Sequence, residues 1–294
     1  MALNRSKRNL LFAILLLLPA LLLLCLTIVA PLAKAIISSF REDSLLSTNH
    51  AWNNFANYKA VLGSGEFMHS LGVTLNYVGV VLIVEILVGF GIALLLNQSI
   101  IFRPFFRSII MISWAVPTIV AALVFMWMFQ NDFGVVNYLL MKTGSISDKV
   151  NWLNHMDLAL YAVMVVAIWR QTPLVVTMLL AGMQGIPSSL YEAANIDGAG
   201  RIQSLIHITI PQLKPILLNV ALITIVNNFQ MLTLFFTLTN GGPVDTTETL
   251  AVLAYSNAFE KFDMGRGAAI GVMWMIILVG ISLFFNRLSR TDGE

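Results

Sequence analysis

The chain has 294 residues, of which 58% are apolar and only 11% are charged, and its mean hydropathy is +0.83. Soluble proteins carry about a quarter charged residues, so this composition excludes a protein surrounded by water on all sides. The net charge of +2 is too small to indicate a nucleic-acid partner, and the single cysteine, Cys25, excludes an internal disulfide or a cysteine-based metal site.

Six apolar stretches are long enough to cross a bilayer. A helix needs about 20 apolar residues to span the hydrocarbon core, and continuous rather than alternating runs favour helices over the strands of a barrel. The expected spans are residues 10–33, 71–96, 108–130, 158–181, 216–238 and 268–286. We therefore predict an all-α integral membrane protein in which residues 1–294 form a single transmembrane domain.

The first stretch also has features of a secretory signal peptide. Arg5, Lys7 and Arg8 precede it, and Ala33 and Ala35 have the small-x-small spacing of a cleavage site. The apolar run is longer, however, than the roughly 7–15 residues of a signal core. We therefore expect the stretch to be retained as a membrane span.

Charged residues between the stretches predict the orientation of the chain. Six spans place both termini on one side, and the segments on that side carry nine Lys or Arg in 62 residues. The opposite segments, residues 34–70, 131–157 and 239–267, carry seven in 93 residues, together with ten of the fifteen acidic residues. Because basic residues are enriched in cytoplasmic segments, both termini are expected in the cytoplasm.

The segment between the fourth and fifth stretches, residues 182–215, carries helix start and stop signals. Ser189 and Glu192 have the spacing of a capping box, in which each side chain bonds the backbone of the other residue. Gly198 and Gly200 stand where glycine commonly ends a helix. A short helix is therefore predicted between these two signals.

A second short helix is expected to follow the glycines. It would run from about Arg201 until Pro211, which lacks a backbone N–H and is expected to break it. The segment would then present two short helices joined at a bend. An ordinary amphipathic connector between two spans has the same pieces, since capping boxes and glycine stops are common.

The complete spacing of this segment resembles the coupling motif of ABC-importer permeases. That motif has E-A-A, three residues, G, nine residues and I-x-L-P, and the matching residues here are Glu192, Ala193, Ala194, Gly198, Ile208, Ile210 and Pro211. Only the leucine differs, since Ile210 replaces it. The extension from Ile196 to Ala199, and Pro215, resemble the carbohydrate-uptake branch, and the segment 238–265 resembles its maltose-type members.

This resemblance implies a six-helix permease of the type I importer fold in the bacterial inner membrane. Its expected partners are a second homologous permease, two copies of an ATP-binding subunit and a periplasmic or lipid-anchored solute-binding protein. The resemblance implies that a cytoplasmic coupling helix contacts the ATP-binding subunit through Glu192, Ala193, Ala194, Asp197 and Gly198. The chain contains no G-x-x-x-x-G-K-[ST] phosphate loop, so ATP and Mg are expected on the partner subunits, with no catalytic or metal-binding residue in this chain.

Polar residues within the stretches are candidates for a solute pathway, because polar groups at membrane depth usually face the bundle interior or a cavity. Thr118, Gln171 and Asn228 each lie about ten to thirteen residues into a stretch, close to the middle of the membrane. Trp114 precedes Thr118 by four residues, which would place both on one helix face. Together they offer hydrogen-bonding groups and an aromatic surface, which suit a sugar.

The resemblance to maltose-type permeases implies that these four residues line the sugar pocket. Other roles remain open from the residues themselves. Trp114 has the chemistry of an aromatic belt residue, Thr118 of a residue bonded to its own helix, and Asn228 of a polar contact between helices.

Two charged residues, Glu85 and Arg170, lie inside stretches. They could pair with each other, or Arg170 could bind an anionic sugar derivative such as a phosphate or sulfonate. A different class of protein, an ion-coupled carrier or channel, would need an intramembrane relay, and Glu85 is the single acid within a stretch. A scaffold or sensor subunit without transport is a third possibility.

Overall fold

The computed structural model describes residues 5–47, 50–98 and 101–291. The two ends of the predicted domain 1–294, residues 1–4 and 292–294, therefore lie outside the described part of the chain. The described residues form helices and connecting loops without a named strand, which confirms the all-α prediction. The chain divides into two compact units, Met1–Gly65 with Ala254–Met273 and Glu66–Leu253 with Trp274–Glu294.

In the first unit, the first apolar stretch forms one long helix. Helices α1 (Arg5–Leu24) and α2 (Ala30–Ser38) are continuous through a π-helical turn at Cys25–Val29. The side chains of residues 12–34 are all exposed, and the most apolar part of this helix has a mean hydropathy of 3.0. A surface of this kind suits contact with lipid or with another apolar helix.

In the rest of the first unit, two segments approach the backbone carbonyl of Arg41. Helix α3 (Ala56–Gly63) carries Asn57, whose amide donates a 2.9 Å hydrogen bond to the carbonyl of Arg41. Gly265 lies near the start of α14 (Met264–Thr291), and a Cβ added there would meet the same carbonyl at 2.5 Å. Glycine at this position therefore allows the two segments to approach.

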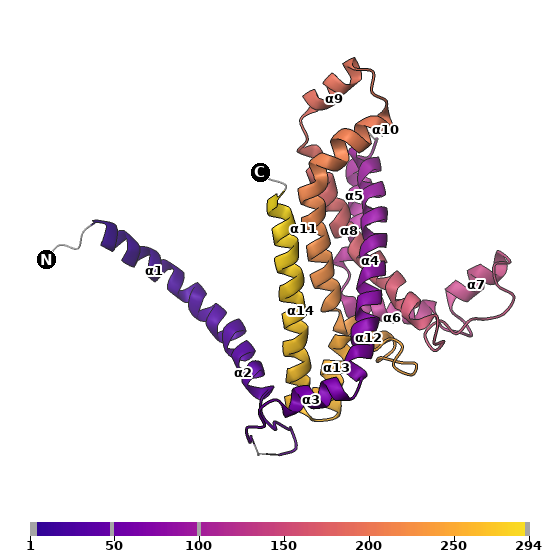
Figure 1. The fold of residues 1–294 in the computed structure, drawn as a ribbon. Helices are drawn as coiled ribbons and strands as arrows, with labels where there is room; N and C mark the ends of the chain where they lie inside the picture. The colour runs from indigo at the N-terminus through magenta and orange to yellow at the C-terminus, as the bar shows by residue number, and fades with distance from the viewer. Residues whose placement is uncertain (1–4, 48–49, 99–100, 292–294) are drawn as a thin grey trace. The chain divides into compact units, whose positions relative to one another are not determined.

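The second unit is a helix bundle built around α8. Its elements are α4 (Glu66–Asn97), α5 (Arg103–Ala115), α6 (Thr118–Met128), α7 (Val135–Lys142), α8 (Ala159–Gln184), α9 (Ser188–Ile196), α10 (Arg201–Ser204), α11 (Ile210–Phe229), α12 (Leu232–Leu238), most of α13 (Leu250–Tyr255) and the second part of α14. Helices α4, α5 and α11 pack against α8, and α9 and α10 lie together beyond one end of them (Figure 1).

Helices α4 and α8 are in close contact along their length. A Cβ added to Gly89 would lie 2.7 Å from Cγ1 of Val175, so glycine is required for this approach. Apolar side chains on both sides of the contact are buried, including Val81 and Val166. The position of α4 against α8 is therefore fixed by packing, and polar residues on the same faces are brought together.

Within the described residues, five helices are long and apolar enough to cross a membrane, and a bent pair of helices supplies a sixth span if it is counted as one. The predicted class of all-α membrane protein with six spans agrees with this. The bent pair replaces the straight helix expected over residues 108–130. Its helices, α5 and α6, meet at an angle of 92°.

Pro117 explains the bend. Val116, the residue before it, is extended (φ −69°, ψ 128°), as residues that precede proline usually are. Helix α5 therefore ends at Ala115, and α6 begins at Thr118. The expectation that Trp114 and Thr118 share one helix face is wrong, because they lie on two helices.

The fifth stretch also differs from the prediction of one helix over residues 216–238. The helix that contains it begins much earlier, at Arg201, and ends at Phe229. Gln230 and Met231 leave helical geometry before the short α12 begins. Asn227 and Asn228, which have low helix propensity, directly precede this end.

Candidate functional site

A buried cluster of polar side chains joins α4, α8 and α11. Oδ1 of Asn228 accepts two hydrogen bonds, one of 2.7 Å from the hydroxyl of Tyr77 and one of 2.8 Å from Nε2 of Gln171. Nδ2 of Asn228 donates a 3.0 Å bond to the carbonyl of Thr224 in the preceding turn of the same helix. Asn228 is 2% exposed and Gln171 is 5% exposed, so these bonds lie in the interior of the bundle.

The cluster brings together two of the four predicted pocket residues, Gln171 and Asn228. It also includes Tyr77, which the sequence analysis did not single out. A tyrosine in an apolar stretch commonly serves as packing, and the position of Tyr77 opposite Asn228 depends on how α4 and α11 pack. Its position at helical spacing from the buried acid Glu85 is the one signal that points to a shared face.

The other two predicted pocket residues lie at the bend between α5 and α6. Trp114 is 47% exposed and Thr118 is partly buried. Neither takes part in the described hydrogen bonds of the Asn228 cluster. The exposed ring of Trp114 leaves an aromatic face available to a solute or to a partner chain.

The two intramembrane charges do not form an ion pair with each other within the described part of the chain. Glu85 is fully buried, and neither of its carboxylate oxygens has a hydrogen-bond partner there. Nε of Arg170 is also buried without a partner, although this side chain as a whole is partly exposed. A buried carboxyl group without a hydrogen-bond partner is unfavourable in the interior of a helix bundle.

The predicted coupling helix is exposed. Glu192, Ala193, Asp197 and Gly198 are exposed, and Ala194 is partly buried. Helix α9 ends at Ile196, directly before the predicted stop at Gly198, which follows the C-cap Asp197 and has a φ of +79°. The N–H groups of Gly198 and Ala199 bond the carbonyls of Asn195 and Ala194 at 3.1 and 2.8 Å, the pattern of a glycine-terminated helix.

Two local predictions in this segment are wrong. The capping box of Ser189 and Glu192 does not form, because the helix begins two residues earlier than it requires, with Pro187 and not Ser189 at its N-cap and no side-chain cap bond. Pro211 does not end the second helix. A π-helical turn at Leu205–Thr209 precedes it, and Ile210 bonds back to Leu205, so the helix continues into α11 with Pro211 near its first turn, where a missing N–H is tolerated.

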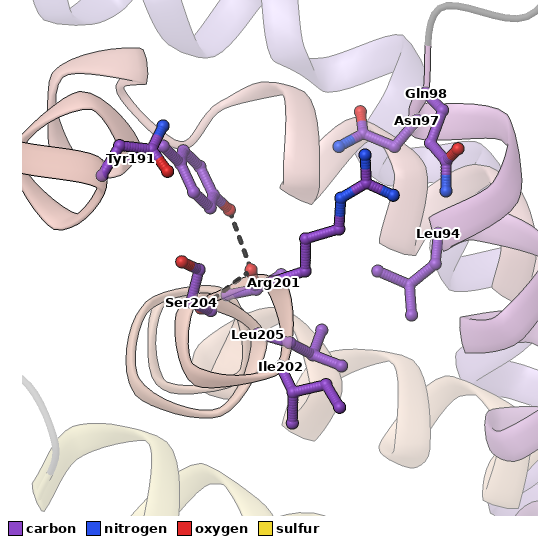
Figure 2. Close-up of a pocket in the computed structure, with 10 residues that line it drawn as sticks. Leu94, Asn97, Gln98, Tyr191, Arg201, Ile202, Ser204 and Leu205 are labelled. Carbon is purple, nitrogen blue, oxygen red and sulfur yellow. Dashed lines mark hydrogen bonds between the residues drawn. The ribbon is translucent and has the colours of Figure 1, made fainter. Parts of the chain in front are cut away.

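The coupling segment is linked to the start of α11 and borders a cavity that is open to solvent. The hydroxyl groups of Tyr191 and Thr209 lie 2.9 Å apart, and Thr209 is buried. Beside this link lies a cavity of about 510 Å³ between α9, α10 and the end of α4 (Figure 2). The side chain of Arg201 extends toward Asn97 and Gln98 across it (Figure 2).

One protein family matches residues 85–290, which is most of the chain. It is described as the binding-protein-dependent transport system inner membrane component. The chain belongs to this family. It is therefore a transport permease, and an ion-coupled carrier or a channel, the alternative class considered from sequence, does not fit this membership.

Relatives of this permease are sugar-transport permeases by name. It is 35% identical to the sulfoquinovosyl glycerol transport system permease protein SmoG of Agrobacterium fabrum, over 96% of this chain and 91% of that protein. It is 32% identical to the trehalose/maltose transport system permease protein MalF of Thermococcus litoralis, over 94% and 92%. The predicted resemblance to the sugar branch is confirmed at the level of the family.

The fold of this permease is also that of a solved importer. It aligns with a TM-score of 0.84 and 21% identity to a chain of a bacterial ABC transporter involved in the import of the acidic polysaccharide alginate, covering 97% of this chain and 96% of that one. Because the identity is low, this likeness bears on the fold alone. The predicted fold class, an importer permease of type I, is confirmed.

Proposed function

We propose that this chain is the membrane subunit of an ATP-driven importer for a sugar or sugar derivative, and that it works by alternating access. The names of the relatives support the solute class, since they are permeases for trehalose/maltose and sulfoquinovosyl glycerol. The chain would lie in the bacterial inner membrane with both termini in the cytoplasm. A scaffold or sensor subunit would lack a solute pathway, so solute uptake separates it from the proposed role.

The importer would contain three kinds of partner. A second homologous permease would complete the pathway, two copies of an ATP-binding subunit would supply ATP hydrolysis with Mg, and a periplasmic or lipid-anchored protein would deliver the solute. The absence of a phosphate loop from the sequence supports the assignment of the ATPase to another chain.

The observation that carries this proposal is the exposed helix α9. It ends at Gly198 in the left-handed conformation, and its exposed face includes Glu192 and Ala193. A helix with one carboxylate beside two alanines, presented outside the bundle, is suited to enter a cleft in a partner protein. In the proposed function, Glu192, Ala193, Ala194, Asp197 and Gly198 contact the ATP-binding subunit.

The solute would pass between the bend of α5 and α6 and the Asn228 cluster. Gln171 and Asn228 would offer amides, Thr118 a hydroxyl and Trp114 an aromatic face to the sugar. In the present conformation the amide oxygen of Asn228 is engaged by Tyr77 and Gln171. Solute binding would therefore require an exchange of these bonds, which is consistent with a pocket that forms in only one access state.

An anionic sugar derivative is a second candidate solute. Arg170 is next to Gln171, is partly exposed, and has no ion pair with Glu85 in the described part of the chain. A guanidinium in this position would match a sulfonate or phosphate through paired hydrogen bonds. The sulfoquinovosyl glycerol permease among the relatives supports this candidate. Arg170→Gln would then reduce uptake of a sulfonated sugar more than uptake of a neutral one.

Purification from native membranes in mild detergent tests the proposed function. Mass spectrometry is expected to find a second permease and an ATP-binding subunit in near-stoichiometric amounts. Glu192→Ala and Gly198→Ala are expected to lower uptake and the stimulation of ATP hydrolysis by the solute-binding protein, because the first removes the carboxylate and the second strains the end of α9.

Ser189→Ala is the matched control, since Ser189 is an exposed residue of the same helix without a described side-chain bond. It should leave both activities unchanged. A chain that purifies alone, and whose uptake does not respond to these substitutions, would contradict the proposal.

A further inference from the structure

The cavity beside the coupling segment has the chemistry of an anion site. Its walls come from three places: the end of α4, helix α9 and the helix that begins at Arg201 (Figure 2). Among the described residues that line it, Arg201 alone is charged, and no acidic side chain is present to neutralise it. Its guanidinium therefore makes the cavity electropositive.

The donors in this cavity are exposed to solvent and have no protein partner in the described part of the chain. Arg201 forms no ion pair there, and the side-chain amides of Asn97 and Gln98, toward which it points (Figure 2), form no described hydrogen bond. A guanidinium offers five N–H donors in a planar fork, and each amide adds two. Such a set of unused donors matches the several oxygens of one tetrahedral anion better than it matches a neutral ligand.

The size and the remaining walls of the cavity indicate more than a bare ion. A volume of about 510 Å³ exceeds what one phosphate group fills, and Leu94, Ile202 and Leu205 form an apolar side. A ligand that carries a phosphate at one end and a less polar part at the other would contact both sides of the cavity.

We propose that this cavity binds the phosphate group of a phosphate ester, with Arg201 as its paired donor and Asn97 and Gln98 as additional donors. The inference rests on the proposed function, which places this end of the bundle at the cytoplasmic membrane surface. Two sources of the group exist there: the headgroup of an anionic phospholipid and a soluble phosphorylated metabolite. A bound phosphate would tie the end of α4 to the coupling segment and thereby restrict movement of that segment.

Another role of Arg201 makes a different prediction. A cation beside the C-terminal end of α4 also stabilises that helix through its dipole, without any ligand. In that case Arg201→Gln would lower the melting temperature equally with and without phosphate. The effect of phosphate on the melting temperature therefore separates the two roles, and the melting temperature without phosphate does not.

The test uses the complete importer in nanodiscs of phosphatidylcholine alone or of phosphatidylcholine with phosphatidylglycerol, and, in the neutral discs, with added glycerol 3-phosphate. The measurements are ATP hydrolysis stimulated by the solute-binding protein and the number of phosphatidylglycerol molecules retained in native mass spectrometry. If the source is lipid, we expect a change of about fivefold in hydrolysis between the two kinds of disc. If the source is soluble, glycerol 3-phosphate should produce the change in neutral discs.

In either case Arg201→Gln is expected to abolish the response, and Arg201→Lys, which keeps the charge but not the fork, is expected to weaken it. Arg107→Gln is the matched control, because Arg107 is an exposed arginine of α5 that does not line the cavity. It should respond as the wild type does.

An equal response of the wild type and Arg201→Gln in both arms, or no response and no retained lipid in the wild type, would overturn the inference. A complex without any stimulated ATP hydrolysis would count against the proposed function, while lipid retention would still decide the site.

Discussion

The hydroxyl of Tyr77 donates a 2.7 Å hydrogen bond to Oδ1 of Asn228, a residue 151 positions further along the chain. The same oxygen accepts the bond from Gln171, so one amide ties three helices together. This arrangement fixes the orientation of the Asn228 side chain, because its oxygen must face the two donors while its nitrogen faces Thr224. The Asn228 amide is therefore held in one orientation in this conformation.

Tyr77→Phe is expected to weaken this orientation without disrupting packing. The phenyl ring keeps the edge-on contact with Phe235, whose centroid lies 4.7 Å away, while the bond to Asn228 is lost. A hydrogen bond between helices in a membrane contributes about 0.6–2 kcal/mol. Because the loss of this bond weakens the orientation of Asn228, the concentration of solute for half-maximal uptake should rise by roughly three- to thirtyfold. Tyr161→Phe, at an exposed position of α8, should leave uptake unchanged. Equal behaviour of the two variants would contradict a role for Tyr77.

Asn228→Ala is expected to abolish solute uptake while leaving the complex assembled. It removes the acceptor shared by Tyr77 and Gln171, so two buried donors lose their partner at a cost of about 1–3 kcal/mol each. Asn227→Ala is the control, because Asn227 is exposed on the neighbouring position of the same helix. Uptake of labelled sugar by cells, with quantification of the protein in the membrane, measures the difference. Comparable uptake by both variants would exclude Asn228 from the pathway.

Tyr191→Phe and Thr209→Val test the link between α9 and the start of α11. Each removes one hydroxyl of the 2.9 Å contact and is expected to lower the amount of sugar imported per ATP hydrolysed. Because the two hydroxyls share this bond, and the other bond of Thr209, to the carbonyl of Ser204, is long at 3.4 Å, the double variant should be little worse than either single variant. Additive losses would show that the two hydroxyls act separately.

Glu85→Gln is expected to preserve ATP-dependent uptake. The carboxyl is fully buried and its oxygens have no described partner, so its replacement by an amide of the same shape removes no bond present in this conformation. The melting temperature should be unchanged or higher, because the protein no longer has to bury an ionisable group. An ion-coupled carrier predicts the opposite result, with uptake abolished by this substitution and unaffected by depletion of ATP.

The sequence was informative where a local pattern determines the structure. Apolar length predicted the helices at 71–96 and 158–181 to within a few residues, and Gly198 predicted the end of α9. The sequence was less informative about whether a proline ends a helix. Pro117 breaks its helix completely, while Pro211 is accommodated by the π-helical turn before it. Both prolines have the same intrinsic chemistry, so the residue type alone does not separate the two outcomes.

The candidate site was predicted only in part, because the sequence shows local patterns and not contacts between distant helices. Gln171 and Asn228 stood out as polar residues in apolar surroundings, and they do meet. Tyr77 did not stand out, because its role depends on a partner from a distant helix. The relation between Trp114 and Thr118 was wrong, since it assumed an unbroken helix across Pro117.

The uninterrupted helix from Arg201 to Phe229 has a mechanical consequence. The distance from Arg201 to Asn228 along it is about 40 Å at 1.5 Å per residue. A tilt of about 5° would move the far end by roughly 3.5 Å, enough to break a hydrogen bond such as that between Asn228 and Tyr77. A helix that tilts as one body would thus convert a small displacement outside the membrane into a change at its centre, without a relay of side chains between the two.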